Sequence, residues 1–179
     1  MSRFDELTPL FDAWRNNWVE QYHQHQLLAP RIAKRVQEFL GCPEDFPSDD
    51  GTKIKYVSPT HAKWDDETAD FTLVAYKNPF EDVDFRDDGY FYFGLRIYLE
   101  HGPRTYPKEA FWFLFRGKQE SNSFTVWVER SKRQFNLDTD AGSEIESLCE
   151  HLFDLLKADL VASPISRAAK EPFRIGFLA

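Results

Sequence analysis

The chain has 179 residues, of which 42% are hydrophobic and 16% aromatic, and its formal net charge is −8. This length fits one domain with a sizeable core, so we place no domain boundary within residues 1–179. The acidic balance argues against duplex nucleic acid as a partner, because such binding depends on lysine and arginine neutralising phosphates.

The same composition bears on compartment and cofactors. No apolar run approaches the roughly 18 residues that a membrane-spanning helix needs, and the first residues lack the basic-then-apolar order of a signal peptide. The two cysteines, Cys42 and Cys149, are far apart in the sequence, which predicts reduced thiols in a cytoplasmic protein. We therefore expect no disulfide, no cofactor and no membrane partner.

Two N-terminal helices are predicted from apolar residues that recur at three- and four-residue spacing. The first has Thr8 as its N-cap and Pro9 at its first helical position. Its apolar residues are Leu7, Leu10, Phe11, Trp14, Trp18 and Tyr22. A break near Ala29-Pro30 leads into the second helix, whose apolar residues are Leu28, Ile32, Val36, Phe39 and Leu40. Residues 42–51, rich in proline and aspartate, are predicted to form a loop.

Five strands and a third helix complete the predicted fold. The strands are roughly Thr52–Ser58, Asp70–Lys77, Tyr90–His101, Ala110–Lys118 and Ser123–Arg133. Short polar connections favour an antiparallel meander, since parallel crossovers need a dozen or more residues. A capping box at Ser143 and Glu146 begins the last helix. Its predicted buried stripe consists of Ile145, Leu148, Cys149, Leu152, Leu155, Leu156 and Leu160. The predicted class is α+β, with two N-terminal helices, a five-stranded meander and a C-terminal helix; residues 164–179 form a docking tail or a sixth strand.

Alternation along residues 90–100 divides the predicted sheet into two aromatic faces. The first face is rich in phenylalanine, and we expect helices to cover it. Its members include Phe91, Phe93, Leu95, Ile97, Phe111, Phe113, Phe115, Phe124, Val126 and Val128, with Phe71, Leu73 and Ala75 assigned to the same side.

The second face mixes aromatic rings with arginine, and we take it as the candidate binding surface. Its candidate binding residues are Tyr92, Arg96, Tyr98, Trp112, Arg116 and Trp127. Tryptophan left in water would forgo burial, so something is expected to cover this face. Three covers remain open: a helix or the tail of the same chain, a partner chain including a second copy, or a stacked ligand. Tyrosine, tryptophan and arginine are the residues enriched at interface hot spots.

Two loops carry the remaining candidate chemistry. The acidic loop of residues 79–89 fails the calcium-loop pattern, because Arg86 and Phe93 fall where oxygen ligands belong, so no metal site is predicted. The loop of residues 101–107 places His101, Arg104 and Tyr106 together, which are residue types used in acid–base catalysis. A turn stiffened by its two prolines explains the same loop. Glycine-rich phosphate loops and serine-nucleophile turns are absent from the sequence.

Two functional hypotheses follow. The first is a non-enzymatic protein-binding or regulatory module, of the inhibitor or immunity type, that uses the aromatic sheet face and the acidic loop to bind another protein or a second copy of itself. The alternative is a small enzyme or ligand-binding protein with a pocket between sheet and helix near the loop from His101 to Tyr106.

Overall fold

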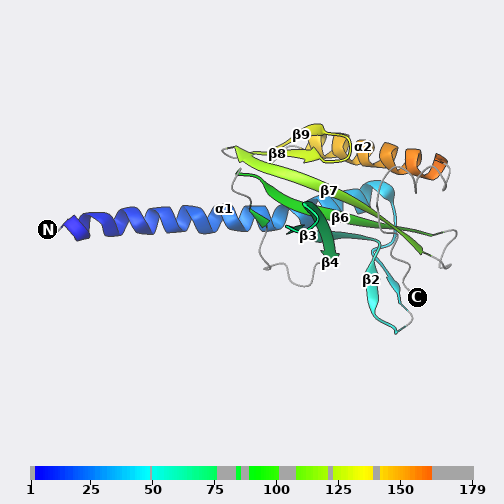
Figure 1. Ribbon diagram of the computed structural model, residues 1–179, viewed down its shortest axis with the longest axis horizontal. Helices are drawn as coiled ribbons and strands as arrows, with labels where there is room; N and C mark the ends of the chain where they lie inside the picture. The colour runs from blue at the N-terminus through cyan, green and yellow to red at the C-terminus, as the bar shows by residue number, and fades with distance from the viewer. Residues whose placement is uncertain are drawn as a thin grey trace.

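The computed structural model describes residues 3–48, 50–75, 84–85, 89–100, 108–120, 123–138 and 142–162 (Figure 1). Within these ranges an N-terminal helix is followed by an antiparallel sheet and a C-terminal helix, so the predicted α+β class is confirmed. Neither described helix combines the length and apolar character needed to cross a lipid bilayer.

Helix α1 (Arg3–Leu40) is one continuous helix, and the prediction of two N-terminal helices is wrong. Thr8 is not an N-cap; its hydroxyl donates to the carbonyl of Phe4 at 3.2 Å, inside the helix. Pro30 also lies within the helix, where proline typically costs about 3 kcal/mol. The helix continues because Ile32 and Val36, which are 0% and 1% exposed, stay on one buried face, and their burial offsets that cost.

The stretch predicted as a loop contains a small hairpin, β1 (Asp45–Pro47) paired with β2 (Lys53–Lys55). The main sheet has seven strands in the described residues. They are β3 (Val57–Asp65), β4 (Asp70–Ala75), β5 (Asp84–Phe85), β6 (Phe91–Glu100), β7 (Lys108–Glu120), β8 (Ser123–Val128) and β9 (Arg133–Asp138). Their order is β4-β3-β6-β7-β8-β9, all antiparallel, with β5 also paired to β6.

The five-stranded meander is therefore only partly right. Strands β6 to β8 follow one another as predicted, but β9 is a further strand that was not predicted, and β3, rather than β4, lies beside β6. Strand β3 was missed beyond Ser58 because it contains Pro59, which reads as a strand breaker. In the structure β4 pairs with β3 only from Thr60 onward, so Pro59 lies where β3 has one described neighbour. The last predicted strand ends at Val128, in a turn in which Lys132 has a φ of 56°.

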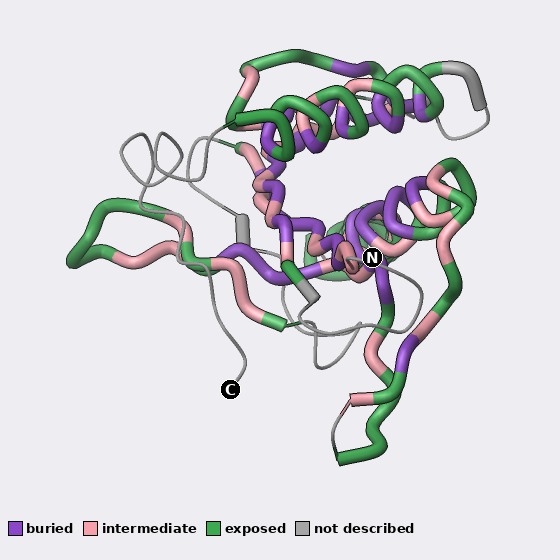
Figure 2. Tube along the Cα trace, turned by 90° about the vertical axis from the view of Figure 1, so that its right-hand side faces the viewer, coloured by how far each residue is buried: buried purple, intermediate pink, exposed green. Residues whose placement is uncertain are grey.

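Both helices lie on the same side of the main sheet (Figure 2). Helix α2 (Gly142–Val161) buries Leu148 and Leu152, and its predicted apolar stripe is confirmed as far as Leu156. The second half of α1 lies beside it. Their apolar side chains meet the phenylalanine-rich face, in which the rings of Phe93 and Phe115 stack at 5.0 Å. Cys42 and Cys149 are free thiols, and Cys149 is buried in this core.

The register corrects one part of the face assignment. Leu73 lies opposite Ala62, and Ala75 opposite Thr60, which itself lies opposite Gly94. Because directly opposed residues share a face, Phe71, Leu73 and Ala75 belong with Tyr92 and Arg96 rather than with the phenylalanines. The insertion of β3 between β4 and β6 causes the error, since the alternation of β4 alone cannot reveal which neighbour sets its register.

Candidate functional site: the open face of the sheet

No described helix covers the second face of the main sheet, which we call the open face (Figure 2). Strand pairing brings all six predicted binding residues to it. Arg96 of β6 lies opposite Trp112 of β7, and Tyr92 lies opposite Arg116, which in turn lies opposite Trp127 of β8. Except for Tyr98, these six side chains are half-buried, so their rings and guanidinium groups remain accessible at the surface.

Arg96 forms the first of two arginine–aromatic clusters on the open face. Its guanidinium carbon lies 4.8 Å from the ring centroid of Tyr98 and 5.4 Å from that of Trp112. Its Nε atom is buried and makes no hydrogen bond among the described residues. No carboxylate of the described residues forms an ion pair with Arg96. Cation–π contacts hold this guanidinium in place while leaving its hydrogen-bonding capacity in part unused.

Tyr98 is the buried member of this cluster. It is 6% exposed, because the ring of Phe46 in β1 packs against it at 5.3 Å. Its backbone N–H also donates to the carbonyl of Tyr56 at 2.8 Å. The small hairpin that the sequence did not predict therefore closes one end of the open face, and Tyr98 positions Arg96 rather than forming the outer surface.

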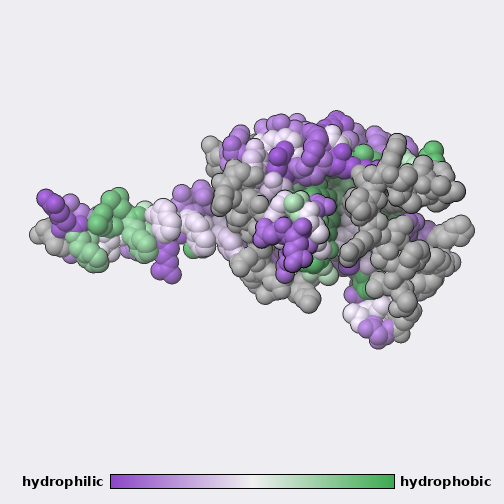
Figure 3. Space-filling model, viewed as in Figure 1, coloured by the Kyte–Doolittle hydropathy of each residue, from purple (hydrophilic) through white to green (hydrophobic). Residues whose placement is uncertain are grey.

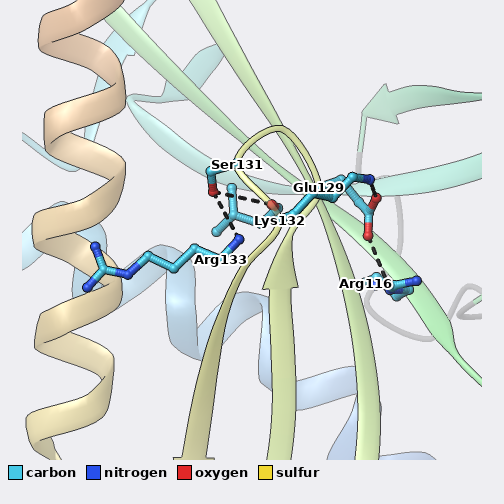
Figure 4. A network of polar contacts seen from close by, with 6 residues as sticks. Arg116, Glu129, Ser131, Lys132 and Arg133 are labelled. Atoms are coloured by element: carbon cyan, nitrogen blue, oxygen red, sulfur yellow. Dashed lines mark hydrogen bonds and ion pairs between the residues drawn. The ribbon is translucent and has the colours of Figure 1, made fainter.

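Arg116 forms the second cluster, between the rings of Tyr90 and Trp127. Its guanidinium carbon lies 4.8 Å from the centroid of Tyr90 and 5.0 Å from that of Trp127. Unlike Arg96, Arg116 has its positive charge compensated by a carboxylate of the described residues. Arg116 Nε lies 3.1 Å from Glu129 Oε1, and Glu129 also pairs with Lys132 in the β8–β9 turn (Figure 4). The two clusters thus present one neutralised arginine and one without a described carboxylate.

Three further aromatic residues of the open face are not among the six predicted binding residues. Phe71 stacks on Tyr92 with a centroid distance of 4.2 Å, and Trp64 packs against Phe71 at 5.0 Å. Tyr90 packs against Trp127 at 5.6 Å. Only the correct register of β3 and β4 could have placed Phe71 and Trp64 here, whereas Tyr90 shares the alternation of β6 and was available from the sequence.

The catalytic candidates His101, Arg104 and Tyr106 lie outside the described residues, as do most of the acidic loop and the tail of residues 164–179. Within the described ranges, no three histidine, cysteine, aspartate or glutamate residues gather in a way that could hold a metal ion. One surface hollow lies at the β3–β4 hairpin and another between α1 and α2. None of the six predicted binding residues lines either hollow.

One contact on the covered side resembles a nucleophile–base pair: Ser131 Oγ lies 2.8 Å from His151 Nε2. Its geometry opposes that role. Arg133 lies 3.3 Å from His151 Nδ1 and can only donate, so Nδ1 accepts and the proton is on Nε2, which faces the hydroxyl. Ser131 in turn donates to the carbonyl of Val128 (Figure 4). A general base must face the hydroxyl with an unprotonated nitrogen, so this contact stabilises the turn.

Comparisons with protein-family models, with curated proteins and with solved structures found no match to this chain.

Proposed function

We propose that this protein is a non-enzymatic binding module, of the regulatory or inhibitor type, that recognises a partner protein through the open face. The observation that carries the proposal is the Arg96 cluster. A guanidinium held over Tyr98 and Trp112, with a buried Nε that lacks a described hydrogen-bond partner, combines the three residue types enriched at interface hot spots. A partner carboxylate beside this guanidinium would compensate the charge that no carboxylate of the described residues pairs with.

The chemistry of the face suggests the kind of partner segment that it binds. Arg96 places a positive charge without a described carboxylate partner among aromatic rings, although the whole chain carries −8. Arg116 and Lys118 add guanidinium and ammonium groups that already pair with Glu129 and Glu120. Carboxylates match the planar fork of arginine, and apolar side chains match the exposed parts of Trp112 and Trp127. We therefore expect an acidic partner segment that also carries apolar residues.

The test is photo-cross-linking from position 112 in the cells from which the protein comes. A cross-linkable aromatic residue, which keeps a ring beside the Arg96 guanidinium, replaces Trp112 in one sample and Phe153 in the control. Phe153 is a matched site, because it is an exposed aromatic residue of α2 with the Lys157 ammonium 4.9 Å from its ring centroid. We expect one dominant protein adduct from position 112 and none from position 153.

The second arm of the test removes the arginine. Arg96→Ala should abolish the adduct formed at position 112, whereas Lys157→Ala should leave it unchanged. Circular dichroism confirms that each variant is folded. Equal adducts from positions 112 and 153, or an adduct insensitive to Arg96→Ala, would show that the open face does not select a partner.

A further inference from the structure

The first half of α1, residues 3–24, extends beyond the sheet into open space, and we call it the projecting half (Figure 1). It carries a row of large apolar side chains on its surface (Figure 3). These are Phe4, Leu7, Leu10, Phe11, Trp14, Trp18 and Val19, with exposures from 51% to 75%. They leave roughly 800 Å² of apolar side-chain surface in water, whereas contiguous apolar patches of monomers seldom exceed a few hundred Å².

Five residues of this row, which we call the seam, lie on the same side of the helix as its buried face. Phe4, Leu7, Phe11, Trp14 and Trp18 alternate in spacing between three and four residues, which is the pattern of a helix that pairs with another helix. At about 100° per residue these positions fall on the side that, from two turns after Trp18 onward, carries buried His25, Ala29, Ile32 and Val36. The projecting half therefore presents the surface that the rest of α1 buries against the sheet.

The size of the exposed row matches one side of a protein–protein interface. A standard interface buries about 800 Å² on each partner. Two projecting halves laid against each other along the seam would supply most of that area from both sides, since only Leu10 and Val19 lie on the flanks of the helix.

The charges of the projecting half favour a second helix of this kind over a lipid surface. The four acidic residues, Asp5, Glu6, Asp12 and Glu20, outnumber Arg3 and Arg15, whereas helices that lie on anionic membranes are basic. All four carboxylates fall on the side of the helix away from the seam. Two copies can therefore meet along the seam without bringing carboxylates together.

The phase of the seam also selects the orientation of the two helices. A second helix packed on the seam lies on the same side of α1 as the main sheet, which packs against that side from about residue 25 onward. In a parallel pair, the second copy would continue past residue 24 into the volume of the first copy's sheet. In an antiparallel pair, the N-terminus of the second copy lies next to the first copy's sheet without entering it. The globular body of the second copy then lies beyond the N-terminus of the first.

We propose that the projecting half of α1 is a dimerisation element, on which a second copy of this chain lays its own projecting half in antiparallel orientation about a two-fold axis between Phe11 and Trp14. The arrangement is isologous and closed, so it produces a dimer rather than a filament. It uses a surface separate from the open face, which stays available in both copies.

Sedimentation of the full chain tests the proposal with two variants of one helix. Trp14→Glu places a charge on the seam, and Asn16→Glu places the same charge on the opposite side. Both positions are exposed in the single chain, so neither loses core packing, and Trp14 gives up only its ring contact with Phe11 in the same helix. We expect a wild-type dimer at micromolar concentration, an unchanged dimer for Asn16→Glu, and at least about a thirtyfold rise in the dissociation constant for Trp14→Glu. A wild-type monomer at 100 micromolar, or equal effects of the two variants, would overturn the proposal.

Oxidative cross-linking tests the orientation. In the antiparallel pair residue 4 of one copy lies beside residue 21 of the other, so a mixture of Phe4→Cys and Gln21→Cys chains should cross-link between these two positions. Cross-links between two copies of residue 21 would indicate a parallel pair and refute the proposed geometry. Mass spectrometry of the cross-linked peptides separates both from products of Cys42.

Discussion

The two faces of the main sheet are both aromatic, yet they differ in what their rings contact. On the covered face rings meet rings, as in the Phe93–Phe115 stack, and Phe91 packs edge-on against His25 of α1 at 4.6 Å. On the open face some rings also stack, as Phe71 does on Tyr92, but Trp112 and Trp127 meet guanidinium groups and are half-buried. Aromatic content alone thus does not distinguish a helix-covered face from an accessible one. The arginines among the rings do, because arginine is almost never buried unpaired.

The largest difference between the faces should appear when a core side chain is truncated. Leu95 and Phe113 lie opposite each other on the covered face and are 1% and 2% exposed. Replacing either with alanine should lower the free energy of unfolding by roughly 2–5 kcal/mol, because a cavity remains in the packed core. Urea denaturation measures the loss. An unchanged midpoint would mean that the assigned register is wrong.

A glycine on the covered face should give the next largest effect. A Cβ at Gly117 would lie 2.2 Å from the ring of Phe91, which is 1% exposed and has no space to move. Gly117→Ala should therefore destabilise the protein by about 1–3 kcal/mol through overpacking. Replacing Phe91 with leucine in the same chain should recover part of the loss. If Gly117→Ala alone is neutral in thermal denaturation, the core is looser than the structure shows.

Truncation on the open face should cost less than truncation on the covered face. Trp112 is half-buried and contacts Arg96 through a cation–π interaction, which contributes about 0.5–1 kcal/mol at accessible sites. We expect Trp112→Ala to reduce the free energy of unfolding by no more than about 2 kcal/mol while abolishing partner binding. A loss as large as that of Phe113→Ala would assign Trp112 to the core and would remove the basis of the proposed function.

The sequence predicted those features of the fold that depend on local periodicity. The alternation from Phe91 to Leu99 and the stripe of α2 from Ile145 to Leu156 are set by neighbouring residues, so both could be predicted without the rest of the molecule. The same alternation grouped Arg96, Trp112 and Trp127 on one face before their contacts were known.

The features that failed depend on distant parts of the chain. Pro30 reads locally as the end of a helix, but the helix continues because residues on both sides of it pack under one sheet. Phe46 lies in a stretch of turn residues, and its burial against Tyr98 comes from a strand some fifty positions later. The position of β3 beside β6 depends on pairing between strands that are separated by β4 and β5. Periodicity carries no information about such partners.

The smallest effect we expect is a pH dependence of the free energy of unfolding, which arises from two histidines on the covered side of the sheet. Burial lowers the pKa of His25, although its hydrogen bond to the carbonyl of Gln21 opposes the shift. Burial and the nearby Arg133 guanidinium lower the pKa of His151. The folded protein therefore binds these protons less readily than the unfolded chain, in which the histidine pKa is about 6.5. Their neutral forms stabilise the fold fully above that pH, and the contribution declines as the pH falls through 6.5 toward the lower folded values.

Urea denaturation of the wild type at pH 7.5, 6.0 and 5.0 should show this decline, and His151→Gln should reduce its slope. Binding at the open face should behave differently. The proposed contacts of the open face involve arginine and aromatic side chains rather than histidine, so the partner's affinity for the folded protein should not follow the loss of stability. Stability that stays flat between pH 7.5 and 5.0 would contradict the burial of neutral imidazoles under the sheet. An affinity that falls in parallel with stability would mean that the open face depends on the covered side, and that the two faces are not independent surfaces.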